Sequence, residues 1–210
     1  MNELFNFGLL VFTSFFTLIN PLGTMPIFMS MTADLTVKER TRTARKASII
    51  AFFTILFFAF TGQLLFGFFN ISVNSFRMVG GVIFFLMGMD MLNARLAKFK
   101  VGNENVKAYV DDISITPLAI PMICGPGAIT NAIVLMDDAI TVEKKIVLIA
   151  VIFLVILLTF TILFSASKIM KVLGDTGNKV LMRIMGLIVM VIAVEFFFSG
   201  LIPMLKQAFN

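Results

Sequence analysis

Two of the long apolar stretches in this chain are interrupted by proline and glycine, one in each half of the sequence. The first reads LINPLGTMPIF, over residues 18–28, and the second reads TPLAIPMICGPGAITN, over residues 116–131. Proline lacks an amide hydrogen and clashes with the preceding helical turn, so neither stretch can be an unbroken helix. Inside a membrane, irregular backbone is tolerated only within protein or beside a water-filled cavity. Interruptions at matching places in two halves therefore point to the substrate site of a transporter.

The composition places the chain in a membrane. Of its 210 residues 59% are hydrophobic and only 14% are charged, and the mean hydropathy is +1.01. A soluble domain of this length could not cover so much apolar surface, so we expect the lipid bilayer to be its solvent and partner. The net charge of +5 comes from basic residues in short loops between apolar runs, so we expect no nucleic-acid partner.

The residues available for chemistry are few. The sequence has no His, which removes the commonest metal ligand and the commonest acid–base group near neutral pH. Its single Cys excludes an intrachain disulfide and a cysteine metal cluster. We therefore expect no metal, no cofactor and no enzymatic activity. An intramembrane enzyme would need a nucleophile with a base partner, and Cys124 has no evident one.

The apolar runs predict an all-α integral membrane protein with six transmembrane segments. A spanning helix needs about 20 residues. The predicted spans cover residues 4–31, 47–69, 76–92, 113–136, 146–166 and 180–201, of which segments 1 and 4 are broken at the Pro/Gly motifs. A polar loop over about 95–112 separates repeat one, about 1–100, from repeat two, about 113–210. Each broken span needs protein around it, so we expect a single transmembrane domain over 1–210.

The positions of Lys and Arg predict the orientation. Four of the 17 fall on one side of the six spans: Arg77, Lys144, Lys145 and Lys206. The other 13 lie in or beside the first, third and fifth loops, including Arg95, Lys98 and Lys100 in the third. Since cytoplasmic loops carry the excess of Lys and Arg, these three loops are predicted to be cytoplasmic and both termini to face outward, into the periplasm.

Three spans in each half would place the second half upside down relative to the first. Residues 76–80, FRMVG, match residues 182–186, MRIMG, at an offset of 106, and Pro21 matches Pro126 at 105. Chance similarity between apolar helices is the alternative explanation. We predict two inverted three-helix repeats.

The first break offers a set of polar backbone groups. Asn20 precedes Pro21, a pairing that biases its backbone away from helix, and Gly23, Thr24 and Pro26 follow. A half-helix ending near Asn20 presents free carbonyls, and one starting near Thr24 presents free amides. These two ends suit a zwitterion, with an ammonium on the carbonyls and a carboxylate on the amides. A simple proline kink in a packed helix is the structural alternative.

The second break repeats the pattern. Its candidate binding residues are Pro121, Cys124, Gly125, Pro126, Gly127, Thr130 and Asn131. A pocket bordered by glycine, threonine and asparagine, without a cation in either break, suits a small neutral solute. Asp90 and Glu195 are candidate coupling or gating residues, because charges within spans are expensive. Gln63, a polar side chain within the second span, is a third candidate. Snorkelling to the interface is the alternative for the two acids, and a helix–helix hydrogen bond is the alternative for Gln63.

The motifs NPLGTMPIF and PLAIPMICGPGAIT, with six spans of this size, resemble the MarC family of bacterial inner-membrane proteins. The matching positions include Asn20, Pro21, Gly23 and Pro26 in the first motif. In the second they are Pro117, Pro121, Gly125, Pro126 and Gly127. The resemblance implies an inner-membrane permease, with a branch that moves glycine, alanine and similar neutral amino acids together with protons.

Together these features predict a secondary transporter of small neutral amino acids that works by alternating access around the two broken helices. No Walker-type loop is present, so ATP is not the expected energy source. The alternatives are a non-transporting membrane scaffold or regulatory protein, and an exporter of another small solute. The oligomeric state is left open.

Overall fold

The computed structural model describes residues 2–93 and 106–209. The described residues form helices and turns and include no strand, which confirms the all-α prediction. Arg95, Lys98 and Lys100 of the charge count lie outside the described residues. The helices, in chain order, are α1 (Asn2–Ile19), α2 (Pro21–Met31), α3 (Val37–Phe68), α4 (Val73–Leu92), α5 (Val106–Ile113), η1 (Ser114–Ile123), α6 (Pro126–Asp138) and α7 (Val142–Phe209).

Five stretches of these helices are long and apolar enough to cross a membrane. They are Glu3–Met31, Val37–Phe68, Val73–Leu92, Val142–Ile169 and Thr176–Gln207. The pair Ala108–Ile123 and Pro126–Asp138 gives a sixth span if it is counted as one, and it bends by 59° at its break. The two breaks therefore differ, because the first leaves a nearly continuous span whereas the second turns the chain sharply.

Two boundaries differ from the sequence prediction for identifiable reasons. Helix α3 begins ten residues before the apolar run at 47, because Thr36 and Glu39 form a capping box that starts the helix in the basic segment. Helix α7 contains the predicted fifth and sixth spans, and the chain turns back within it at Gly174. Gly174 has φ 65° and ψ 179°, a conformation that is essentially confined to glycine.

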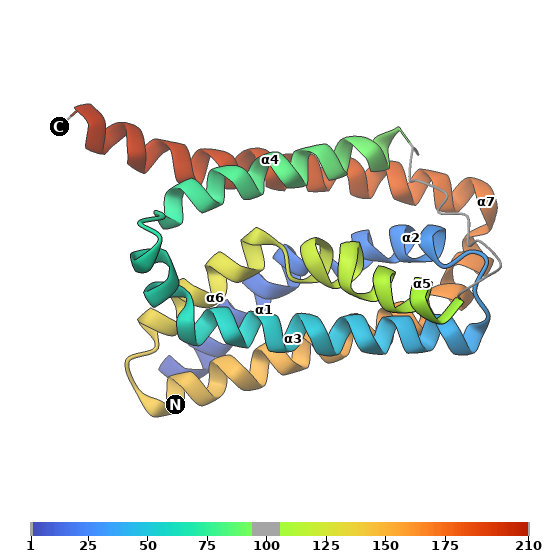
Figure 1. The fold of residues 1–210 in the computed structure, drawn as a ribbon, viewed down its shortest axis with the longest axis horizontal. Coiled ribbons are helices and arrows are strands. Elements are labelled where there is room, and N and C mark those ends of the chain that lie inside the picture. Colours follow the sequence, from blue (N-terminus) through green and yellow to red (C-terminus); the bar gives the residue numbers. More distant parts are fainter. Residues whose placement is uncertain (1, 94–105, 210) are drawn as a thin grey trace.

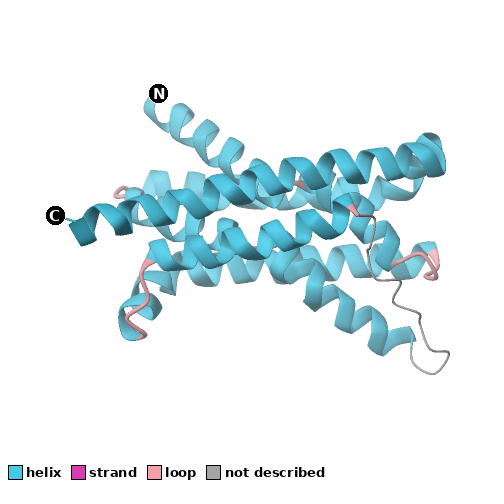
Figure 2. Cartoon of the chain, turned by 90° about the horizontal axis from the view of Figure 1, so that it is seen from above, coloured by secondary structure: helices cyan, strands magenta, loops and turns pink. Residues whose placement is uncertain are grey.

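The helices lie roughly parallel to one axis, and the chain direction alternates from one span to the next (Figures 1 and 2). Both termini lie at one end of the bundle, whereas the α2–α3 turn and the turn at Gly174 lie at the other (Figure 1). Each span of the second half consequently runs opposite to its counterpart in the first. The repeat relationship itself, and the side of the membrane on which each end lies, stay predictions.

Helix α4 and the second half of α7, the third and sixth spans, pack side by side through glycines (Figure 1). A Cβ atom added to Gly88 would lie 2.8 Å from the carbonyl oxygen of Gly186, and one added to Gly186 would lie 2.8 Å from the carbonyl oxygen of Gly88. A Cβ atom on Gly81 would lie 2.7 Å from the carbonyl oxygen of Ala193. The small-residue stripes of these two spans therefore allow the helix backbones to approach closely.

This packing makes Gly88→Ala a destabilising change. The new methyl group would lie 2.6 Å from the Met190 side chain, and also 2.8 Å from the Gly186 carbonyl oxygen and 3.0 Å from the Met190 amide nitrogen. The side chain can shift but the two backbone atoms cannot do so easily, and overpacking of this kind costs about 1–3 kcal/mol. Thermal unfolding in detergent should show a clearly lower midpoint than for the wild-type protein. Gly67→Ala is the matched control, because nothing lies within 4 Å of its added Cβ. An equal effect of the two changes would contradict the proposed packing.

The two halves are also joined at both ends of the bundle. At the end that holds the α2–α3 turn, the Tyr109 hydroxyl donates to the Met31 carbonyl at 2.8 Å, and Lys46 and Asp111 form an ion pair at 2.8 Å. At the end that holds the termini, Lys144 Nζ lies 2.6 Å from a Glu3 carboxylate oxygen.

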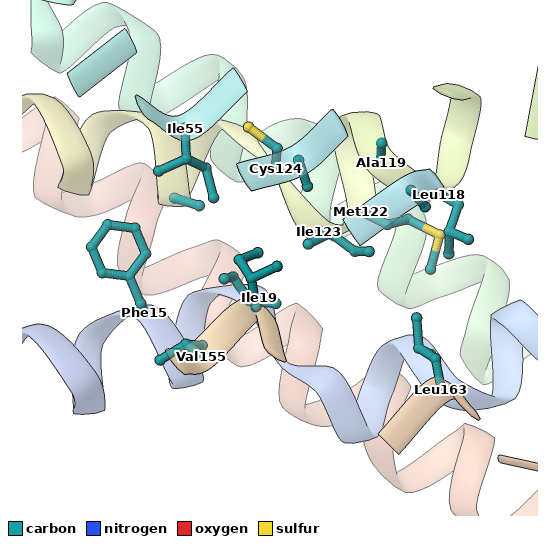
Figure 3. Close-up of a cluster of buried hydrophobic side chains, with 14 of the residues drawn as sticks. Phe15, Ile19, Ile55, Leu118, Ala119, Met122, Ile123, Cys124, Val155 and Leu163 are labelled. Atoms are coloured by element: carbon teal, nitrogen blue, oxygen red, sulfur yellow. The ribbon is translucent and has the colours of Figure 1, made fainter. Parts of the chain in front are cut away.

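The broken spans lie at the centre of the bundle. Buried side chains from both of them, from α3 and from the first half of α7 form one cluster (Figure 3). The labelled members include Phe15 and Ile19 of α1, Ile55 of α3, Ile123 of η1 and Val155 of α7. Protein therefore surrounds the irregular backbone around residues 122–127, as a hydrocarbon environment requires. Thr116 and Ile120 of η1, by contrast, lie at the exposed surface of the bundle.

Candidate functional site

The first break is centred on Asn20, which adopts a left-handed conformation with φ 45° and ψ 66°. Its Oδ1 accepts a hydrogen bond from the Gly23 amide at 3.1 Å and so caps helix α2. Helix α2 begins at Pro21, which is tolerated at the first helical position because its missing amide has no helical acceptor there. The expectation that the second half-helix starts near Thr24 was wrong, because the Asn20 cap starts it three residues earlier.

Polar groups remain available beside this cap. Pro21 has no amide hydrogen, so the Thr17 carbonyl lacks the donor that it would have in a continuous helix. The Thr24 hydroxyl donates to the Asn20 carbonyl at 3.1 Å and to the Ile19 carbonyl at 3.3 Å. The Asn20 Nδ2 atom is buried and has no hydrogen-bond partner. The first break thus offers one carbonyl acceptor and one buried amide donor.

The second break has a different local structure. The segment η1 is wound as a π-helix with Pro117 and Pro121 inside it, and Thr116 and Ile120 take extended backbone conformations. Helix α6 then begins at Pro126, with Gly125 as an N-cap that has no side chain to accept a hydrogen bond. The first turn of α6 is buried, so its amides carry the partial positive charge of a helix N-terminus without a side-chain cap.

Two polar side chains follow in α6. The Thr130 side chain is 1% exposed, and its hydroxyl has no hydrogen-bond partner. The Asn131 Nδ2 donates to the Ser14 hydroxyl of α1 at 3.0 Å. Asn131 therefore ties the two broken spans together.

Phe84 of α4 links the two breaks. A Cβ atom on Gly125 would lie 2.6 Å from its ring, and one on Gly127 would lie 3.4 Å from it. The same side chain, which is 5% exposed, also lines a cavity beside the first break. The glycines of the second motif therefore make room for an aromatic ring that separates the α6 N-terminus from this cavity.

The cavity holds about 30 Å³, which is room for one or two water molecules. Of the predicted binding residues, it brings together Asn20, Gly23 and Thr24. The rest of its wall comes from residues that flank the first break or lie on η1, α4 and the second half of α7: Thr17, Leu18, Ile19, Ile27, Phe84, Met87, Met91, Met122, Val189 and Ile192. In the part of the chain that the structure describes, no charged side chain lines it.

The other predicted site residues lie outside this wall. Pro21 and Pro26 are buried in α2, whereas Cys124, Gly125, Pro126, Gly127 and Thr130 are buried around the second break and Pro121 and Asn131 are partly exposed there. The three candidate coupling residues, Asp90, Glu195 and Gln63, are exposed on the surface of the bundle. The structure does not bring them to the cavity.

Sequence reasoning missed the apolar side of the cavity. Phe84, Met87 and Met91 lie three and four residues apart on one face of α4, and Met122 comes from η1. The spacing on α4 shows that the three share a helix face. It does not show that this face meets the first break, because similar stripes occur wherever a helix packs.

Cys124 should be inert towards membrane-impermeant thiol reagents in this conformation. Its side chain is 0% exposed and lies among apolar side chains (Figure 3). We expect modification only after denaturation, measured as the mass added by a maleimide. Asp138→Cys, at an exposed position at the end of α6, is the positive control. Rapid labelling of native Cys124 would contradict the closed arrangement of the second break.

These features define an integral, multi-pass membrane protein in which two interrupted spans meet at the centre of a helix bundle. The chain belongs to the MarC family of integral membrane proteins, whose sequence model matches residues 5–205. It is 38% identical over 193 residues to a UPF0056 membrane protein of Pyrococcus horikoshii, covering 92% of this chain and 93% of the relative. The UPF0056 membrane protein YvbG of Bacillus subtilis is 36% identical and is covered to 95%. No solved structure matches the chain.

Proposed function

We propose that this protein is a secondary transporter of small neutral amino acids such as glycine or alanine, working by alternating access around the two broken spans. The observation that carries the proposal is the set of polar groups left without partners at the two breaks. Unpaired buried polar groups cost free energy, so they are retained where a ligand or water can satisfy them. Both Asn20 Nδ2 and the Thr130 hydroxyl are of this kind.

The chemistry of the breaks fits a zwitterion. The end of α1 presents the Thr17 carbonyl together with the partial negative charge of a helix C-terminus, which suits an ammonium group. The Asn20 amide at the cavity is a donor that suits a carboxylate. The uncapped N-terminus of α6 supplies further donors behind the Phe84 ring, which a carboxylate would reach when the ring moves. The absence of charged side chains from the described cavity wall favours a solute without net charge.

The small size of the cavity fits a closed conformation, and the structure offers a route by which it could open. A second cavity of about 390 Å³ lies between α2, α3 and α7, at the end of the bundle that holds the α2–α3 turn. Pro26 of α2 lines this outer cavity, whereas its neighbour Ile27 lines the small one. Helix α2 is thus the wall between the two, and its movement would connect the small cavity to the basic end of the bundle.

The location, orientation and energy source belong to the same proposal. The loop charges support an orientation with the termini outside, and the family resemblance supports a location in the bacterial inner membrane. Proton coupling is supported by the family resemblance. The described structure places no carboxylate at the cavity, so Asp90 and Glu195 would have to act from the bundle surface.

Counterflow in liposomes tests the proposal. Liposomes that contain the purified protein and are loaded with unlabelled glycine should transiently accumulate labelled glycine or alanine from outside. They should not accumulate labelled lysine or glutamate. Accumulation of a different small solute instead would favour the exporter alternative. The small cavity also fits a non-transporting scaffold, and the absence of both counterflow and binding of glycine, alanine and serine would favour that function.

Phe84→Ala should change the size selectivity of the transporter. Removing the ring would enlarge the closed cavity next to the proposed carboxylate site. Room for one additional methylene group in a hydrophobic pocket changes discrimination between two substrates by about 1–3 kcal/mol. The ratio of valine flux to glycine flux should therefore rise roughly tenfold or more in the variant. Phe57→Ala, at a residue that is 54% exposed on the bundle surface, is the control. An unchanged ratio in folded Phe84→Ala protein would contradict a role of the ring in selectivity.

A further inference from the structure

A groove of about 320 Å³ runs along the outer surface between α3 and the first half of α7, away from the broken spans. Its wall is apolar, and Arg45 and Ser48 lie one helical turn apart at one end of it. We propose that this groove binds one acyl chain of an anionic phospholipid, with the lipid phosphate on the Arg45 guanidinium. This site is independent of the proposed transport function.

The apolar part of the groove faces the lipid. Phe53 and Phe153 are 62% and 54% exposed, and Leu157 beside them is 46% exposed. Phe52 and Phe153 meet edge to face, with ring centroids 5.7 Å apart, and so join the two helices beneath the groove. A hollow with aromatic and aliphatic walls on a membrane-facing surface suits a hydrocarbon chain.

The polar end of the groove lacks partners of its own. Within the described residues the Arg45 guanidinium forms no ion pair or hydrogen bond, whereas the adjacent Lys46 is paired with Asp111 at 2.8 Å. Ser48 is 4% exposed, and its hydroxyl has no hydrogen-bond partner. A guanidinium binds phosphate through two parallel hydrogen bonds, so the exposed Arg45 side chain is the group that would hold the phosphate.

The depth of these groups fits the headgroup region. Arg45 lies two residues before the apolar run that starts at 47, at the edge of the hydrocarbon layer. At 1.5 Å per residue, Phe53 lies about 12 Å farther along α3, towards the bilayer centre. An anionic lipid would therefore place its phosphate at Arg45 and the upper part of its chain between Phe53 and Leu157. A second copy of this chain would leave the Arg45 charge without a counter-ion, unless it supplied an acid at that point.

Binding of phosphatidylglycerol tests this inference, with phosphatidylcholine of the same acyl chains as the comparison. Native mass spectrometry of the detergent-purified protein should show phosphatidylglycerol retained preferentially. A basic side chain near an anionic lipid contributes about fivefold in affinity, so Arg45→Ala should weaken binding roughly fivefold or more. Arg45→Lys should lose less, because it keeps the charge. Arg183→Ala, at an exposed arginine of the second half of α7, is the matched control and should bind normally.

Leu157→Trp tests the groove without touching the charge. The larger side chain should fill the hollow and reduce phosphatidylglycerol retention, while thermal unfolding without lipid stays near that of the wild-type protein. Equal retention of the two lipids, or equal losses in Arg45→Ala and Arg183→Ala, would overturn the proposal. It would also be overturned if Leu157→Trp left lipid retention unchanged. Loss of a dimer in this variant would likewise overturn it, because the groove would then bind a second copy of this chain.

Discussion

Gly125→Ala is expected to abolish solute flux. A Cβ atom at this position would lie 2.6 Å from the Phe84 ring and 2.7 Å from the carbonyl oxygen of Pro121. The ring can shift, but the carbonyl belongs to the backbone of the break, so the break itself must move. Because the site depends on where the α6 amides lie, a displacement of this backbone should remove the proposed carboxylate contacts.

Counterflow of glycine and thermal unfolding should be measured on the same preparation of Gly125→Ala. Overpacking is expected to lower stability by about 1–3 kcal/mol, which a folded preparation can tolerate. Gly127→Ala is the milder variant for comparison. Its added methyl group would lie 3.0 Å from the end of the Leu18 side chain, and this side chain can shift. We expect a smaller loss of flux for this variant. Full flux in Gly125→Ala would show that the geometry of the second break does not limit transport.

Asn20→Gly is expected to eliminate transport while leaving the fold nearly unchanged. Glycine adopts the left-handed conformation of residue 20 readily and costs only a few tenths of a kcal/mol at an N-cap. The variant keeps the backbone of the break but removes the buried Nδ2 donor that has no partner in the structure. Loss of glycine binding with an unchanged unfolding midpoint would therefore assign the side chain to the solute.

Two further substitutions separate the roles of Asn20. Asn20→Ala loses the cap, which costs about 0.5–2 kcal/mol, and forces alanine into the left-handed region, which costs about 1–2 kcal/mol more. It should therefore be unstable as well as inactive. Asn20→Asp keeps an acceptor for the Gly23 amide at the cap but replaces the donor with a carboxylate oxygen. If Asn20→Asp transported glycine at the wild-type rate, the proposed contact between Nδ2 and the solute carboxylate would be wrong.

The breaks could be predicted from the sequence because their cause is local and covalent. Pro21, Pro117 and Pro121 lack amide hydrogens wherever the chain folds, so each removes a helical hydrogen bond in any conformation. An isolated proline such as Pro203 is accommodated inside α7, so the grouping of prolines with glycine is what marks the breaks. The apolar runs could be predicted for a similar reason, since a segment of about 20 apolar residues has few alternatives to a membrane-spanning helix. Helix boundaries were less predictable, as the Asn20 cap and the early start of α3 at Val37 show.

The cavity could not be predicted in the same way. Only Asn20, Gly23 and Thr24 of the predicted binding residues line it, and its opposite wall is formed by apolar side chains of α4 and η1. Which side chains meet depends on the rotation of each helix about its axis. In this protein that rotation is set by distant contacts, such as the approach of Gly88 to Gly186 and the contact of Phe84 with Gly125.

The sequence alone therefore determined that this protein lies in a membrane, that it is helical, and where two of its spans break. These properties depend on backbone chemistry and hydrophobicity, which are local to each segment. The tertiary structure decided how the two breaks are used. It capped the first with the Asn20 side chain, left the second without a side-chain cap, and placed the Phe84 ring between them. Packing between helices decides this, because it determines which polar groups at the two breaks form hydrogen bonds within the protein and which remain for a ligand.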